Sequence, residues 1–112
     1  MILHIIEKED WNKVENKEFY TPSSLEHEGF IHCSTKEQVV EVANSFFKGH
    51  KNLLLLCIDS NKVDAKIVYE DLLTMGTMFP HIYGPLNIDA VSKVIVFKSS
   101  HDGSFQLPEE LN

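Results

Sequence analysis

Arginine is absent from this sequence. All 10 basic residues of the 112-residue chain are lysines, and against 17 acidic residues they leave a formal net charge of −7. Arginine is the usual bidentate partner of phosphate and carboxylate groups, because its planar guanidinium matches their geometry. A phosphate bound here would depend on backbone N–H groups, lysine, histidine or hydroxyl groups. Because an acidic chain also repels polyanions, we expect no nucleic-acid partner.

Long apolar runs and cysteines are scarce as well. The longest apolar run, Asn52–Ile58 (NLLLLCI), is far too short to span a bilayer, and the first residues have no basic segment typical of a signal peptide. Both cysteines, Cys33 and Cys57, fall in predicted strands, which suits buried free thiols in a reducing compartment. We expect a cytoplasmic chain with no membrane contact. It would form a single domain over residues 1–98, followed by a polar, loosely ordered tail over residues 99–112.

The hydrophobic pattern predicts about six strands and two main helices. The strands are expected at Ile2–Ile6, Phe30–Ser34, Asn52–Asp59, Lys66–Asp71, Phe79–Tyr83 and Val91–Lys98. One helix is expected around Lys8–Asn16, and a second between the strand at residues 30–34 and Gly49. This arrangement favours an α+β domain built on a twisted, mostly antiparallel sheet.

The start of the second helix has two candidate caps. Ser34 is followed three residues later by Glu37, and Thr35 is followed by Gln38, so either pair would form a capping box. Free backbone N–H groups at a helix start also bind anions. Ser34 and Thr35 are therefore candidate ligand-binding residues, although capping alone explains them equally well.

Three of the six histidines lie at the centre of short apolar strands: His4, His32 and His81. Because side chains alternate between the two faces of a strand, His32 shares a face with Ser34, and His81 shares one with Tyr83. If the strands are neighbours, the imidazoles line one cleft, where histidine suits general acid–base catalysis near neutral pH. The alternative is that each histidine is a satisfied structural residue.

Three further residues are candidates for the same cleft. Glu70 ends a predicted strand and is the acid best placed to assist the histidines, whereas a solvated strand end is the alternative explanation. The loop before the second strand would form a lid, with Tyr20 and Ser23 as its contact residues, or a plain connection.

Several motifs, in order along the chain, resemble those of one bacterial family. They are LHII, YTPSSLEHEGFIHCSTKEQV, LLLLCID, VYED and FPHIYGPLNIDAV, and the similarity runs from Leu3 to about Phe97. The family is called domain of unknown function 952, and its fold resembles the ADP-ribosyltransferase fold. The resemblance implies a split β-sheet around a cleft for NAD or a related nicotinamide nucleotide.

The same resemblance implies a role for His4, which matches a first-strand histidine that hydrogen-bonds the adenosine-side ribose of NAD. The sequence also departs from the superfamily. The stacking tyrosine falls on Ile31 with His32 beside it, and His81 and Tyr83 stand in the region of the late catalytic glutamate. The arginines on which RNA 2′-phosphotransferases depend are missing. The resemblance therefore implies the fold and a ribose-binding histidine, but it does not imply the reaction.

These observations support three hypotheses. The leading one is binding of a nucleotide such as NAD or ADP-ribose, or ADP-ribosyl-type transfer, in which His4 orients a ribose and His32 or His81 is the general acid–base. The second is a non-catalytic module that binds a small metabolite or a protein partner in the same groove. The third is a metal hydrolase that uses three histidines. No His-x-His or His-x3-His pair occurs, so we expect no metal cofactor.

Overall fold

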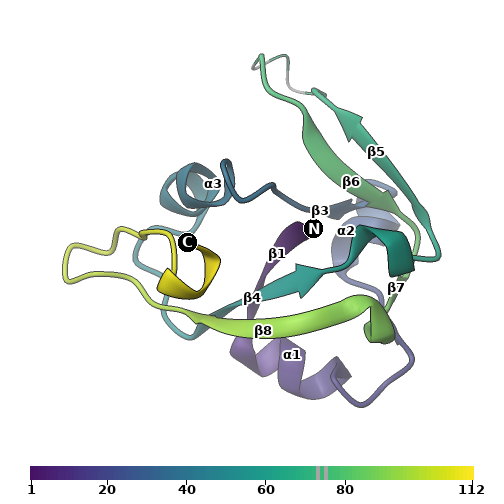
Figure 1. Cartoon of the computed structure of the whole chain (residues 1–112), viewed down its shortest axis with the longest axis horizontal. Coiled ribbons are helices and arrows are strands. Elements are labelled where there is room, and N and C mark those ends of the chain that lie inside the picture. Colours follow the sequence, from purple (N-terminus) through teal and green to yellow (C-terminus); the bar gives the residue numbers. More distant parts are fainter. Residues whose placement is uncertain (73, 75) are drawn as a thin grey trace.

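A computed structural model of the chain describes residues 1–72, 74 and 76–112. This part of the chain contains eight strands, three α-helices and three short 3-10 helices (Figure 1). In chain order they are β1 (Ile2–Glu7), α1 (Lys8–Val14), β2 (Phe19–Tyr20), α2 (Ser23–His27), β3 (Ile31–His32), α3 (Val39–Phe46), β4 (Leu53–Ile58), η1 (Ser60–Lys62), β5 (Lys66–Glu70), β6 (Phe79–Tyr83), β7 (Leu86–Asn87), η2 (Ile88–Ala90), β8 (Val91–Phe97) and η3 (Glu109–Leu111). The predicted mixture of helices with antiparallel sheets is confirmed.

The first sheet has the strand order β1-β4-β8, and both of its pairings are antiparallel. In Figure 1 its strands cross the lower half of the view. All six residues of the central strand β4 are buried. Because both faces of the sheet are covered, alternate side chains enter different cores: Leu54 packs in one cluster and Leu55 in the other. Burial on both faces explains the uninterrupted apolar run in the sequence.

The second sheet has the order β3-β6-β5, again antiparallel, and β2 pairs separately with β7. β5 and β6 form the long hairpin at the upper right of Figure 1. Ile31 and Ile82 lie opposite one another and are fully buried in the first core cluster. Since side chains alternate along each strand, the other face of this sheet carries the paired residues His32 and His81. We call this face the outer face.

The two larger sheets meet where the chain leaves β3. The strand predicted at Phe30–Ser34 is shorter than expected, because only Ile31–His32 pairs with β6. Ser34 instead forms an antiparallel bridge with Leu3 of β1, with N–H···O distances of 2.8 Å in both directions. The N–H of Cys33 still donates to the carbonyl of Pro80 on β6 at 3.1 Å, so the chain passes from the second sheet to the first between Cys33 and Ser34.

Because of this bridge, the second predicted helix begins later in the sequence than expected. α3 begins at Val39, and residues 36–38 form a turn before it. The N–H of Thr35 donates to Oε1 of Gln38 at 3.0 Å, so the Thr35–Gln38 pair makes one of the two bonds of a capping box. Ser34 does not start the helix, because its backbone is held against β1. Among the described residues, no helix has the length and apolar character needed to cross a membrane.

The C-terminal segment packs against the second core cluster, which corrects the expectation of a loosely ordered tail. Phe105 is 2% exposed and Leu111 is 8% exposed, and both belong to the cluster of Phe97. Asn44 of α3 donates from Nδ2 to the carbonyl of Phe105 at 3.2 Å and accepts the Phe105 N–H at 2.6 Å. The sequence hides this packing because the apolar residues of the segment are isolated among polar ones.

Candidate functional site

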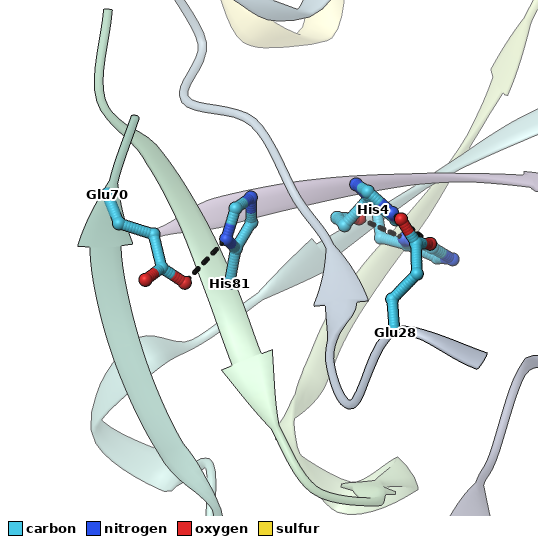
Figure 2. A network of polar contacts seen from close by, with 5 residues as sticks. His4, Glu28, Glu70 and His81 are labelled. Carbon is cyan, nitrogen blue, oxygen red and sulfur yellow. Dashed lines mark hydrogen bonds and ion pairs between the residues drawn. The ribbon is translucent and has the colours of Figure 1, made fainter. Parts of the chain in front are cut away.

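A buried histidine is paired with a carboxylate on the outer face. His81 is 6% exposed, and its Nδ1 lies 2.8 Å from Oε2 of Glu70 on the neighbouring strand (Figure 2). Glu70 lies opposite Phe79 in the register, so its contact with His81 is diagonal across the strand pair. Because an ionised carboxylate only accepts hydrogen bonds, Nδ1 carries a proton, and in a ring that is protonated only there Nε2 keeps its lone pair.

Nε2 of His81 is open to the surface. Within the described residues, every buried side-chain nitrogen or oxygen has a hydrogen-bond partner, and the one bond of the His81 ring is that to Glu70. Nε2, which has no such bond, must therefore reach solvent. Figure 2 shows it on the side of the ring away from Glu70. A carboxylate on Nδ1 with Nε2 left open is the arrangement that suits a general base.

Tyr83 holds Glu70 in place. Its hydroxyl donates to the same carboxylate oxygen that His81 contacts. These hydrogen bonds, that of Tyr83 first, hold the pKa of Glu70 below its ordinary value, and the bond to Glu70 raises the pKa of Tyr83. At neutral pH Glu70 is therefore a carboxylate and Tyr83 a neutral donor. Two donors on one oxygen fix Glu70, and through it the ring of His81.

A second histidine–carboxylate pair lies beside the first. His32 is directly opposite His81 in the register, with ring centroids 5.7 Å apart. Phe30 stacks on His81 at 4.0 Å and meets His32 edge-on at 4.7 Å. Nε2 of His32 lies 2.7 Å from Oε2 of Glu28, and both side chains are about half exposed. The outer face thus carries one buried pair, His81–Glu70, and one exposed pair, His32–Glu28.

His4 does not join these two histidines on the outer face. It is 8% exposed; its Nδ1 donates to the carbonyl of His32 at 2.6 Å, and its Nε2 accepts the hydroxyl of Tyr20 at 3.0 Å. Burial lowers the pKa of His4 to about 4 and raises the pKa of Tyr20, so both are neutral. One ring thereby connects β1, β3 and β2, which belong to three different sheets. Neither of its nitrogens is open to a ligand, which differs from the expectation that His4 lines the cleft.

Ser34 and Thr35 also lie apart from the histidine pair. Ser34 is 5% exposed and belongs to the bridge with β1. The N–H that Thr35 would offer to an anion is taken by Gln38. The structure therefore favours the structural explanation for both residues.

A groove of about 520 Å³ adjoins Tyr83, between the α2 segment and the turn after β6. Its size falls within the range of small-molecule sites. It is lined by Thr21, Pro22, Ser23, Leu25, Glu26, Gly29, Tyr83, Gly84 and Pro85. Two predicted site residues, Ser23 and Tyr83, are thus brought together here. Tyr20, the other predicted contact residue of this segment, is buried against His4 instead.

Two residues of the site were not predicted. Glu28 stands four positions before His32, and this short spacing was a signal that could have been used. Phe30 shares the face of His32 in the sequence pattern, but its stacking on His81 depends on the pairing of β3 with β6. Because Phe30 and His81 lie far apart in the sequence, no local pattern could reveal their stacking.

The described residues contain no group of three or more His, Cys, Asp or Glu side chains placed to hold a metal ion. His4 has both ring nitrogens bonded within the protein. The arrangement thus lacks the three convergent histidines on which the metal-hydrolase hypothesis rests.

Comparison with known proteins identifies the relatives of this chain. Residues 5–94 match the family described as "Protein of unknown function (DUF952)". The chain belongs to this family. The predicted family membership is therefore confirmed. No curated protein matches the chain.

Solved structures of a protein from Caulobacter crescentus, CC0527, resemble this DUF952 chain. The crystal structure is 29% identical with a TM-score of 0.86, covering 98% of this chain and 96% of that one. The crystal structure of a double mutant gives the same values. The solution NMR structure is 26% identical with a TM-score of 0.76, covering 97% and 94%. The DUF952 fold is thus shared over nearly the whole length of both proteins.

Proposed function

We propose that this DUF952 protein is an enzyme that binds a ribose-containing small molecule of nucleotide type, such as NAD or ADP-ribose, on the outer face. His81 would be its general base and Glu70 the residue that orients it. One observation carries the proposal: a buried imidazole has a carboxylate on Nδ1 and an open Nε2, and it lies close to a groove of ligand size.

The proposed reaction cleaves the bond between the ribose and its base. Nε2 of His81 takes a proton from water or an acceptor hydroxyl, whose oxygen forms a bond to the anomeric carbon. The carbon–nitrogen bond breaks, and its electron pair leaves with the base. Glu70 stabilises the imidazolium that forms, as a carboxylate does in a catalytic triad. Proton transfer of this kind contributes about 10²–10⁴-fold to a rate.

An ADP-ribosyltransferase-like architecture is part of this proposal. It is supported by two antiparallel three-stranded sheets joined at a bridge, with a histidine on the first strand. The resemblance assigns that histidine, His4, to the ribose. Because both of its nitrogens are bonded to protein atoms, we give His4 a positioning role: it fixes the backbone of His32, opposite the base His81.

The test combines ligand binding with turnover. Thermal unfolding is measured with NAD, ADP-ribose and nicotinamide riboside, and nicotinamide release is then followed chromatographically. A ligand at about one hundred times its Kd stabilises by about 2.7 kcal/mol, which moves the midpoint by several degrees. Glu70→Gln, which preserves the size of the side chain, should keep the ligand-induced shift and lower release by about 10²–10⁴-fold. His101→Asn, at an exposed position in the C-terminal segment, is the control and should change neither. Unchanged release in Glu70→Gln would refute the orienting role of Glu70 in the His81–Glu70 pair.

A specific observation favours a second function, ligand binding without turnover. His81 is not among the residues that line the groove, so a ligand that fills the groove need not touch the imidazole. A non-catalytic module would show the thermal shift with no product, and the shift would be lost on Ser23→Trp, which fills the groove. No shift with any of these compounds would overturn both functions.

A further inference from the structure

The groove beside α2 adjoins the buried histidine pair at two points. Gly29, in its lining, is followed by Phe30, whose ring stacks on His81 at 4.0 Å. Tyr83, also in the lining, donates its hydroxyl to Glu70. Tyr83 follows His81 by two residues on β6, which separates their backbones by about 7 Å. Since His81 itself does not line the groove, the groove adjoins the proposed base without containing it.

Both walls of the groove are fixed by contacts of the backbone. On one side the α2 segment closes on itself, because the N–H of Gly29 donates to the carbonyls of Ser24 and Leu25, each at 3.0 Å. On the other side the turn after β6 packs closely: a Cβ added at Gly84 would meet that of Ala65 at 2.9 Å. The groove is therefore formed before any ligand binds, as is usual for small-molecule sites.

The groove lining combines apolar surface with a few polar groups. Its apolar side chains include those of Pro22, Leu25 and Pro85. Its hydroxyl and carboxylate groups include those of Thr21, Ser23 and Glu26. A flat base packs against apolar surface, and a carboxylate or hydroxyl oxygen accepts hydrogen bonds from the hydroxyl groups of a ribose. The lining therefore suits the nucleoside portion of a ligand.

A lysine stands at the boundary between the groove and the histidine pair. Lys66 lies directly opposite Tyr83 in the register, so both side chains belong to the outer face. Lys66 is exposed, and it is the one lysine in β3, β5 and β6, all of whose residues the structure describes. Because the chain has no arginine, a phosphate that crosses this boundary would have the ammonium group of Lys66 as its cationic partner.

Resting on the proposed function, we infer that the substrate is a dinucleotide of the NAD type, which binds in two halves on either side of Tyr83. The nicotinamide riboside half lies at His81, the pyrophosphate passes Lys66, and the adenosine half occupies the groove. The resemblance instead implies that His4 binds the adenosine-side ribose, but both ring nitrogens of His4 are bonded to protein atoms. Tyr83 serves both halves, because its ring is part of the groove wall and its hydroxyl orients Glu70.

The first experiment compares NAD with nicotinamide riboside, which carries the reacting half alone. Nicotinamide release from each compound is followed chromatographically with the full chain. We expect kcat/KM to be higher for NAD by about tenfold or more, because binding of a remote portion contributes to turnover.

Variants that fill the groove test where the adenosine half lies. Ser23→Trp and Thr21→Trp, both at exposed positions of the lining, should reduce the advantage of NAD to about twofold or less and leave kcat/KM for nicotinamide riboside unchanged. Ser100→Trp, at an exposed position outside the groove, is the matched control and should keep the full advantage. Thermal midpoints measured without ligand establish that each variant is folded.

Two further variants test the boundary. Lys66→Gln should lower kcat/KM for NAD about threefold to tenfold at low salt and leave that for nicotinamide riboside unchanged, whereas Lys93→Gln, at an exposed position of β8, should change neither. Tyr83→Phe keeps the groove wall, so KM for NAD should stay the same. Loss of its bond to Glu70 should lower kcat for both substrates about tenfold.

The outcomes separate this inference from the proposed function. An advantage of NAD that survives both groove-filling variants would overturn the inference, because the adenosine half would then lie elsewhere, and the proposed function would stand. An equal loss of turnover with both compounds in those variants would also overturn it, since the reacting half would then occupy the groove. Release from neither compound by wild type would overturn the inference and the proposed enzyme function together.

Discussion

Acid should destabilise this protein through His4, and His4→Gln should remove that part of the effect. His4 is buried where three sheets meet, and burial lowers its pKa from the ordinary 6.5 to about 4. Between these values the unfolded chain binds a proton that the folded chain does not. Wherever the unfolded chain binds more protons than the folded chain, the free energy of unfolding falls as the pH is lowered. For His4 this loss begins near pH 6.5 and is complete near pH 4.

The size of the loss follows from the two pKa values of His4. Each factor of ten in the ratio of proton affinities corresponds to about 1.4 kcal/mol. The contribution of His4 to the free energy of unfolding should therefore be nearly intact at pH ~7.5, lower by about 1 kcal/mol at pH ~5.5, and lower by about 2–3 kcal/mol at pH ~4.5. Against a total stability of about 5–15 kcal/mol for a small domain, this is a large fraction.

The assay is urea unfolding of wild type and His4→Gln at these three pH values, followed by circular dichroism. At the highest pH the variant should be less stable by about 1–3 kcal/mol, because an amide cannot satisfy both the carbonyl of His32 and the hydroxyl of Tyr20. The difference between the two proteins should shrink by about 2–3 kcal/mol at the lowest pH, and subtraction cancels the titration of shared carboxylates. The exposed-site variant His101→Gln should track wild type throughout. A difference that stays constant with pH would refute the assignment of His4 as a buried neutral ring.

Three further predictions concern packing. Phe105→Ala should lower the free energy of unfolding by about 3–5 kcal/mol in urea, because the 2% exposed ring packs in the second core; a loss below about 1 kcal/mol would contradict the packed tail. Asn44→Ala should cost about 1–3 kcal/mol and accelerate proteolysis of the C-terminal segment, since both bonds to the Phe105 backbone are lost; unchanged cleavage would argue against this anchor. Gly84→Ala should lower the Tm more than Gly29→Ala, because of these two positions only Gly84 would bring a Cβ to 2.9 Å from that of Ala65. Equal decreases in Tm would mean that the positive φ, which both glycines have, accounts for the whole loss and the close contact for none of it.

The first sheet could be predicted because its signals are local. The apolar run Leu53–Ile58 is buried on both faces, and the alternation in Ile2–Glu7 matches the two cores on either side of β1. Burial patterns of this kind can be recognised from consecutive residues of the sequence. The packing of the tail was missed for the complementary reason: Phe105 and Leu111 each reach the core alone, so no period marks them.

The site was predicted only as far as strand alternation reaches. Alternation along each strand put His32 on the same face as Ser34, and His81 on the same face as Tyr83. That His32 and His81 lie opposite one another depends on the pairing of β3 with β6. The same rule fails when it is extended from His32 to Ser34, because the chain leaves this sheet after Cys33 and Ser34 pairs with β1. Side chains alternate between the two faces only along one strand of one sheet. The rule no longer applies where a segment passes from one sheet to another.

His4 and His81 show why the remaining assignments needed the structure. Both stand between apolar neighbours at the centre of a strand, and both are more than nine-tenths buried. The ring of His4 meets a backbone carbonyl and a hydroxyl, which occupy both nitrogens, whereas the ring of His81 meets one carboxylate, which occupies Nδ1 and leaves Nε2 open. The identity of these partners is fixed by residues 11 to 28 positions away in the sequence. A histidine in an apolar strand is therefore a candidate base only once its partners are known, and here the open nitrogen selects His81.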